Sequence, residues 1–268
     1  MKKELGIFLL LVVLCAVVSI KEPLFLSATN LQNTARLIGA YGIFSIGVGI
    51  VIITGGIDLS IGSKMALLGV LLSMMLVGGH WPGALAVLVT VGVSMALGLL
   101  HGTLITRMKI QPFIVTLCGL LFYRGLARYI AHDETKGFGN AAGFERLQEL
   151  ATGRWFGVPA PFVVLIIVSV IMWLVLHRSV FGRYLFAVGR NEDAARYSGI
   201  NTKAVITAAY VICGLLTGVS AILIAFYTNS ISPSSHGNFY ELYGIAAAVL
   251  GGFAAGGLMG TLLGGDDE

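Results

Sequence analysis

Long apolar runs, broken by short polar stretches, cover almost the whole of this chain. A helix that spans a membrane needs about 20 predominantly apolar residues. About eight segments fit, namely Leu5–Ile20, Leu37–Thr54, Ile61–Val77, Gly83–Ile105, Pro112–Ile130, Pro161–Leu176, Val205–Phe226 and Leu242–Gly264. They are apolar on every face, so length and flanking charge define them better than helical periodicity does. The pattern predicts one all-α membrane domain over residues 1–268, a polytopic bundle of about eight transmembrane or re-entrant segments.

The composition supports this prediction and excludes several classes of protein. The chain is 57% hydrophobic and 11% charged, with a mean hydropathy of +0.91, whereas soluble domains carry roughly 25% charged residues. So small a share of charge cannot cover a surface that faces water. The net charge of +4 is spread over short loops and forms no basic run of the kind that binds nucleic acid. Cys15, Cys118 and Cys213 lie in apolar runs and predict neither a disulfide framework nor a metal site.

The first twenty residues resemble a secretory signal, because Lys2 and Lys3 precede an apolar run. No Ala-x-Ala cleavage site follows this run, which ends at Ser19-Ile20-Lys21. We therefore favour an uncleaved first span.

The distribution of lysine and arginine predicts the orientation of the chain. We expect the N-terminus in the cytoplasm, a cytoplasmic loop at about 178–204 and an extracytoplasmic loop at about 131–160. Phe144–Leu150 in the outer loop predicts a short amphipathic surface helix. In this orientation the cytoplasmic side holds the larger basic set, namely Lys2, Lys3, Lys64, Arg107, Lys109, Arg178, Arg183, Arg190, Arg196 and Lys203. The opposite side holds Lys21, Arg36, Lys136, Arg146 and Arg154, with Arg128 near its edge.

Two features inside the spans bear on packing and on the membrane surface. Glycines recur four residues apart, as at Gly98 and Gly102, at Gly214 and Gly218, and in a cluster after Gly251. This spacing favours close contact between helix backbones in lipid. Arg124 and Arg128 share a helical face and predict an interfacial anchor. The alternative is that Arg124 lines a polar path.

The polar stretch Gly55-Gly56-Ile57-Asp58-Leu59-Ser60 interrupts two apolar runs. A carboxylate so close to hydrocarbon is costly unless it is paired, capped or hydrated. With a cytoplasmic N-terminus the stretch falls at the inner end of the second span, where we expect Asp58 to reach water or headgroups. Asp58 or Ser60 would also suit the N-cap of the next helix. We favour a structural, capped break near the inner gate over a substrate ligand.

The inner loop contains Ala187–Ile200, which reads Ala-Val-Gly-Arg-Asn-Glu-Asp-Ala-Ala-Arg-Tyr-Ser-Gly-Ile. Asn191 is a good N-cap, Glu192 and Asp193 place negative charge in a first turn, and Gly199 can end a helix. These residues predict a helix of about two turns, capped at both ends. A helix this short is marginal alone, so we expect it to dock on a partner. The alternative is a surface helix that only connects two spans.

Four motifs together resemble the permease subunits of bacterial ABC-type monosaccharide importers, the ribose/xylose/galactose-type family. They are Thr54–Ser63, Gln111–Leu117, Ala187–Ile200 and Ala246–Gly252. They lie in the family's order and cover nearly the whole chain.

The resemblance implies a multi-pass protein of the bacterial cytoplasmic (inner) membrane that is not itself an enzyme. Such a permease pairs with a second permease copy, with separate ATP-binding subunits and with an extracytoplasmic sugar-binding protein. It binds no cofactor, and ATP is held on the partner, which agrees with the lack of a phosphate-binding loop motif in this sequence. The implied gate motif is Gly55, Gly56, Asp58 and Ser60. The implied ATPase-coupling set is Gly189, Asn191, Glu192, Asp193, Ala194, Ala195 and Gly199.

The sequence departs from the family pattern at two places. It ends at Gly264-Gly265-Asp266-Asp267-Glu268, so we expect it to be short of the family's final spans. Lys64 stands where the family tends to have an apolar residue. We expect this lysine either to neutralise Asp58 in part or to snorkel to the cytoplasmic interface.

Two further functions and one set of residues complete the predictions. A proton- or ion-coupled secondary transporter would use Asp58 as a proton carrier, with Glu241 as a second candidate. A membrane component without transport activity is the third interpretation. A sugar path needs polar groups and aromatic faces, for which the candidates are Phe113, Thr116, Tyr227, Asn229 and Ser230. The sequence does not name the sugar.

Overall fold

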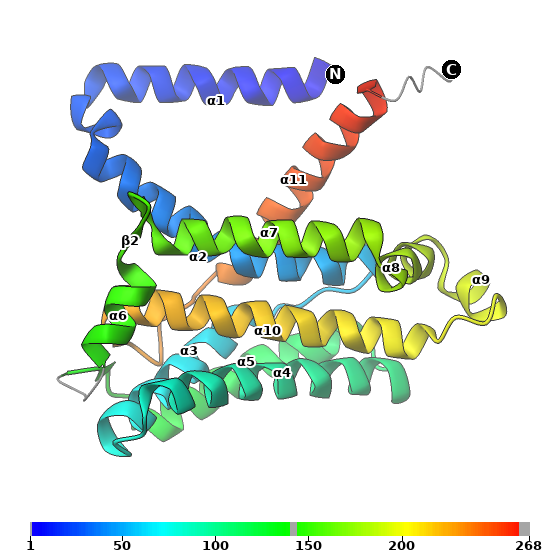
Figure 1. Ribbon diagram of the computed structural model, residues 1–268. Helices are drawn as coiled ribbons and strands as arrows, with labels where there is room; N and C mark the ends of the chain where they lie inside the picture. Colours follow the sequence, from blue (N-terminus) through cyan, green and yellow to red (C-terminus); the bar gives the residue numbers. More distant parts are fainter. Residues whose placement is uncertain (1, 140–143, 263–268) are drawn as a thin grey trace.

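All eight apolar segments are helices in the computed structural model, which describes residues 2–139 and 144–262 (Figure 1). Six of them, counted over the described residues, are long and apolar enough to cross a membrane. These six are α2 (Ala28–Ile53), α3 (Ile61–Ser73) with its π-helical continuation η2 (Met74–Gly78), α4 (Gly83–Arg107), α5 (Pro112–Ala131), α7 (Ala160–Arg178) and α10 (Thr202–Thr228). The other two are α1 (Lys2–Lys21) and α11 (Tyr240–Leu262). The predicted polytopic helical membrane bundle is confirmed, and the predicted end of the last span, Gly264, lies outside the described residues.

Shorter elements connect these helices. The predicted surface helix is α6 (Phe144–Thr152), and the loop between α7 and α10 folds into α8 (Val180–Arg190) and α9 (Glu192–Tyr197). The remaining elements are η1 (Pro23–Leu26), β1 (Lys136–Gly137), β2 (Arg154–Trp155), β3 (Val158–Pro159) and β4 (Ser230–Ile231). α6 and α9 lie at opposite ends of the bundle, which we call the α6 end and the α9 end (Figure 1).

Two small antiparallel pairings order the loops of the α6 end. β1 pairs with β4, with Lys136 opposite Ile231 and Gly137 opposite Ser230. β2 pairs with β3 as a hairpin that leads into α7. The first pairing joins the chain after α5 to the chain after α10, so both helices end at the α6 end.

α2 begins earlier than its predicted first residue, Leu37. The Ser27 hydroxyl accepts a hydrogen bond from the Asn30 amide at 3.3 Å and caps the helix ahead of Ala28. The added turns carry polar side chains and are therefore absent from a pattern based on apolar runs alone.

α10 is the central helix, and it packs against α2 on one side and α4 on the other. At Gly98 of α4 a Cβ would stand only 2.3 Å from the Tyr210 carbonyl oxygen. At Gly214 of α10 a Cβ would stand 2.5 Å from the Ser94 carbonyl oxygen. Ser94 Oγ also donates a hydrogen bond to the Gly214 carbonyl at 2.5 Å. The close backbone contact predicted from the glycine spacing is thereby confirmed for α4 and α10.

Candidate functional site

A buried ion pair occupies the break between α2 and α3. The side chains of Asp58 and Lys64 are both fully buried, and Lys64 Nζ lies 2.7 Å from Asp58 Oδ2. Asp58 Oδ1 accepts hydrogen bonds from the Ser60 amide at 2.9 Å and from the Ser60 hydroxyl at 2.5 Å. Each carboxylate oxygen therefore has a partner, which is the condition under which a buried charge pair persists.

Three predictions for this stretch are corrected by the ion pair. Asp58 does not reach water or headgroups, because it is fully buried. Lys64 does not snorkel to the cytoplasmic interface and does not join the basic residues of the inner side. It pairs with Asp58 instead, which is the other of the two roles expected for it. Ser60 does precede α3, but its hydroxyl makes no capping bond to that helix. The chain turns back into the bundle after α2, so the break lies deeper than its place between two apolar runs suggests.

Three helices each supply one ring to the surroundings of the ion pair. His101 of α4 places Nδ1 4.0 Å from Asp58 Oδ1, and its Nε2 is 2.8 Å from the Tyr123 hydroxyl of α5. The Tyr210 hydroxyl of α10 donates to the Ile57 carbonyl at 3.0 Å. Sequence reasoning missed these three residues, because a single polar ring in an apolar helix carries no local signal of its partner.

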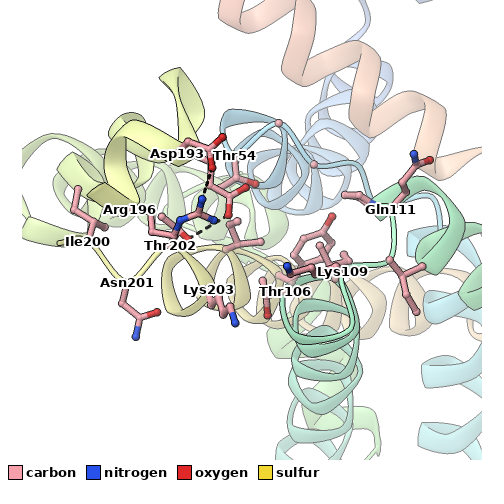
Figure 2. Close-up of a pocket in the computed structure, with 18 residues that line it drawn as sticks. Thr54, Thr106, Lys109, Gln111, Asp193, Arg196, Ile200, Asn201, Thr202 and Lys203 are labelled. Atoms are coloured by element: carbon pink, nitrogen blue, oxygen red, sulfur yellow. Dashed lines mark hydrogen bonds and ion pairs between the residues drawn. The ribbon is translucent and has the colours of Figure 1, made fainter. Parts of the chain in front are cut away.

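A cavity of about 640 Å³ opens at the α9 end and brings two predicted stretches together (Figure 2). Thr54, Gly55 and Gly56 line one part of it, and Glu192 and Asp193 of α9 line another. The cavity reaches the surroundings of the polar cluster, because Tyr210, whose hydroxyl donates to the Ile57 carbonyl, also belongs to its wall. The remaining lining residues are Ile105, Thr106, Lys109, Ile110, Gln111, Pro112, Arg196, Ile200, Asn201, Thr202, Lys203 and Ile206.

α9 has both of the predicted caps. Asn191 Oδ1 accepts a hydrogen bond from the Ala194 amide at 2.9 Å. At the other end Gly199 has a φ of +85°, and its amide donates to the Arg196 carbonyl at 3.0 Å. The Ile200 amide donates to the Ala195 carbonyl at 3.1 Å, which completes a Schellman motif. The prediction of a short helix with two caps is confirmed.

α9 is anchored on one side and open on the other. Ala195 is buried in the main apolar core, and the Thr202 hydroxyl donates to Glu192 Oε1 at 3.2 Å, which ties α9 to the start of α10. Asn191, Glu192, Asp193 and Ala194 are exposed. This arrangement leaves a polar surface free while the far side of the helix is packed.

α8 connects α9 to the bundle and was not predicted. Its N-cap is Ser179, whose hydroxyl accepts from the Gly182 amide at 3.1 Å. Leu185 and Val188 bury one face of this helix in the core. Gly189 touches the end of α2 so closely that a Cβ there would stand 1.9 Å from the Ile53 carbonyl oxygen. Gly189 thus provides close packing between α8 and α2.

The structure does not bring the candidate sugar-path residues together. Thr116 is buried and its hydroxyl donates to the Pro112 carbonyl at 2.9 Å, while Phe113 beside it is 52% exposed. Asn229 ends α10 at the α6 end, at the opposite end of α5 from these two. Tyr227 lies under the Arg36 guanidinium at 5.3 Å from ring centroid to Cζ, and Ser230 is part of β4.

Arg124 connects α5 to the chain between β4 and α11 and is not an interfacial anchor. It donates to the Pro233 carbonyl at 3.1 Å and to the His236 carbonyl at 2.7 Å. Arg128, one turn further along α5, is exposed and pairs with Asp133 at 2.6 Å. The predicted anchor is therefore wrong for Arg124, and for Arg128 it stays a prediction.

The comparisons with known proteins agree with this arrangement of helices. Residues 30–265 match the protein family described as "Branched-chain amino acid transport system / permease component". The chain belongs to this family, as a permease component of an ABC-type sugar importer. It is a translocation subunit rather than an enzyme, and a multi-pass protein of a bacterial membrane.

Relatives extend the likeness over most of the chain. The "Ribose import permease protein RbsC" of Bacillus subtilis (strain 168) is 38% identical over 267 residues, which cover 98% of this chain and 81% of that protein. The protein of the same name from Escherichia coli (strain K12) is 36% identical, over 95% of this chain and 80% of its own length. The "Fructose import permease protein FruF" of Bifidobacterium longum (strain NCC 2705) is 33% identical, over 91% and 70%. No solved structure matches the chain.

Proposed function

We propose that this protein is the permease that carries a monosaccharide such as ribose into the cytoplasm, driven by ATP hydrolysis on a partner subunit. The names of its relatives support this class of substrate, since permeases for ribose and for fructose are both similar to it. Because these relatives are named for ribose, a pentose, and for fructose, a ketohexose, these two classes of sugar are the first to test.

In the proposed assembly, α9 and its flanking residues dock on the ATP-binding subunit. The observation that carries this proposal is the shared cavity, because residues of α9 and the Gly55-Gly56 turn line the same space. A force on α9 has two routes inward, through Thr202 to α10 and through α8 to the end of α2 at Ile53. α2 in turn leads directly into the turn that carries Asp58.

The orientation follows from the same assignment. With α9 on the cytoplasmic side, the orientation agrees with the cytoplasmic N-terminus that the basic residues predict. The α6 end then faces outward. An extracytoplasmic sugar-binding protein then meets the α6 end, and a second permease copy with two ATP-binding subunits completes the importer.

A proton-coupled secondary transporter is contradicted by membership in the ABC permease family. The structure also gives Asp58 no exposed carboxylate to load, since both oxygens are engaged by Lys64 and Ser60.

Reconstituted transport tests the proposed function. The permease is placed in proteoliposomes with its ATP-binding and sugar-binding partners, and uptake is measured over a panel of pentoses and hexoses. We expect saturable uptake of at least one monosaccharide that requires ATP and persists when the proton gradient is collapsed. Uptake that requires the gradient but not ATP, or no monosaccharide uptake at all, contradicts the proposal.

A further inference from the structure

A groove of about 580 Å³ lies between α4 and α10 at the α9 end of the bundle, and we call it the α4–α10 groove. It borders the cavity described above, because Thr106, Asn201 and Lys203 line both. The groove has two unlike halves. Basic and polar side chains line the half at the ends of the two helices, whereas mainly aliphatic side chains line the half that lies further along them.

The polar half carries two positive charges, one from each helix. Arg107 is the last residue of α4 and Lys203 is the second residue of α10, and both are exposed. Among the residues that the structure describes, no carboxylate forms an ion pair with either of them. The amide side chain of Asn201 stands beside them as a further polar group of the groove.

The carboxylates of the neighbouring cavity are held by other partners. Glu192 and Asp193 both line that cavity. Asp193 pairs with Arg196 at 2.6 Å, and Glu192 accepts a hydrogen bond from the Thr202 hydroxyl at 3.2 Å. The two cations of the groove therefore keep their charge for a ligand that comes from outside the described chain.

The aliphatic half lies within the membrane-spanning part of both helices, and Leu99, Val211 and Ile212 line it. α4 has 25 residues and is therefore longer than the bilayer core of about 30 Å, which places Arg107 at the level of the headgroups. Leu99 stands about two turns before Arg107, about 12 Å along the helix axis. Since one leaflet of hydrocarbon is about 15 Å deep, the groove extends from the headgroups well into one leaflet.

The floor of the groove is a close contact between the two helices. A Cβ on Gly102 would stand 2.7 Å from the Thr207 Cα, and the hydroxyls of Thr106 and Thr207 are 3.2 Å apart. The backbones leave no room for a molecule to pass between them at this point. Leu99 on the wall is 48% exposed, as is expected of a side chain that faces hydrocarbon. A ligand therefore reaches the α4–α10 groove from the bilayer.

We propose that the α4–α10 groove binds an anionic phospholipid, with its phosphate at Arg107 and Lys203 and one acyl chain along Leu99, Val211 and Ile212. Basic pockets between spanning helices are a recognised way to bind the headgroups of anionic lipids. The site needs a membrane and no sugar. Only the assignment of its leaflet to the cytoplasmic side rests on the proposed function.

The two halves together favour a lipid over other occupants. A two-fold interface sets the same patch of both copies together, so an interface between copies across this groove would bring its cations against each other. Among the described residues, no aspartate or glutamate lines the groove to offset them. A free phosphate would satisfy the cations and leave the aliphatic half empty. A phospholipid fills both halves.

Native mass spectrometry tests the site, because it counts the lipids bound to each protein. Delipidated permease in a neutral detergent is titrated with dioleoyl phosphatidylglycerol or with dioleoyl phosphatidylcholine, whose headgroup has no net charge. We expect one tight site for phosphatidylglycerol, which Arg107→Gln and Lys203→Gln each weaken about fivefold, the contribution of one basic residue near an anionic headgroup. Arg183→Gln is the matched control, because it removes an exposed charge of α8 outside the groove, and it should leave the affinity unchanged.

A variant in the aliphatic half tests the acyl chain without a change of charge. Ala208 also lines the groove, and in Ala208→Trp the indole ring fills it, so we expect the tight site to be lost. The matched control Leu88→Trp, at a 69% exposed position of α4 outside the groove, should keep the site. Each variant is compared at a wild-type thermal transition without lipid. If Ala208→Trp does not fold, the two charge variants decide the question.

Four results would overturn the lipid site. They are equal affinity for the two lipids, unchanged affinity for phosphatidylglycerol in Arg107→Gln and Lys203→Gln, displacement of the lipid by inorganic phosphate alone, and an altered oligomeric mass in Ala208→Trp with lipid binding intact. The third result would assign the cations to a free anion, and the fourth would assign the groove to a second copy of the chain. Failure of ATP-driven uptake would instead contradict the proposed function alone, since lipid binding needs no transport.

Discussion

The residues around Asp58 show how a charge is kept inside an apolar bundle. Asp58 has Lys64 on one oxygen and Ser60 on the other, with the His101 ring beyond. Taking two ions out of water costs several kcal/mol for each, and only close pairing offsets that cost. The pair therefore specifies where the turn sits more than it adds to the stability of the fold.

A set of three variants tests this interpretation. Asp58→Asn leaves Lys64 buried without a counter-charge and should lower the free energy of unfolding by about 3–5 kcal/mol, as for other broken buried pairs. The double variant Asp58→Asn/Lys64→Met removes both charges and should recover most of that loss. Unfolding of the purified permease in detergent, followed by heat or denaturant, measures both. If the single Asp58→Asn variant kept wild-type stability and uptake, the result would contradict both a requirement for the charge and a role of Asp58 at the inner gate.

Among the elements, α9 stands out because six residues form a helix that carries the proposed link to the ATPase. Isolated helices this short do not persist in water, so caps and anchors must hold this one. The Asn191 cap, the Schellman motif at Gly199 and the buried Ala195 supply them. α9 should therefore respond to small changes that a long helix tolerates.

Asn191→Ala tests the sensitivity of α9. Loss of this cap should cost about 1 kcal/mol of local helix stability and lower the sugar transported per ATP hydrolysed. Asn191→Asp, which keeps an acceptor at the same place, should behave as the wild type. Asn201→Ala is the matched control, because Asn201 caps the 27-residue α10 in the same way, through the Ala204 amide at 3.1 Å. Equal effects of Asn191→Ala and Asn201→Ala would show that α9 has no special part in coupling.

At the scale of the whole molecule, two interrupted pairs of helices meet inside the bundle. α2 and α3 are joined by a turn that enters from the α9 end, and α10 and α11 by a segment that enters from the α6 end (Figure 1). Both α3 and α11 start at depth. Binding sites and gates of membrane transporters commonly use such discontinuous helices. The two interrupted stretches come together where Gly62 at the start of α3 packs against Gly237.

The spans could be predicted from the sequence because length and apolar content define them, and α9 because its caps are local. The depth of Asp58 could not, since nothing in Gly55–Ser60 shows that the chain turns inward. The roles of Arg124 and Tyr210 also depend on partners more than 100 residues away in the chain, at Pro233 and Ile57. Long-range contacts of this kind leave no periodic pattern in the sequence.

The central claim is that α9 couples ATP hydrolysis to the movement of sugar, and Gly199→Val tests it most directly. Valine at a φ of +85° costs about 1–3 kcal/mol of strain, which can shift docking by about tenfold. In proteoliposomes with all partner subunits, we expect the sugar imported per ATP hydrolysed to fall by about that factor while insertion of the permease is unchanged. Glu192→Trp should act in the same direction, and Asn201→Ala, which removes a cap from α10 instead of changing α9, should not. A wild-type ratio in both Gly199→Val and Glu192→Trp would contradict the coupling role of α9.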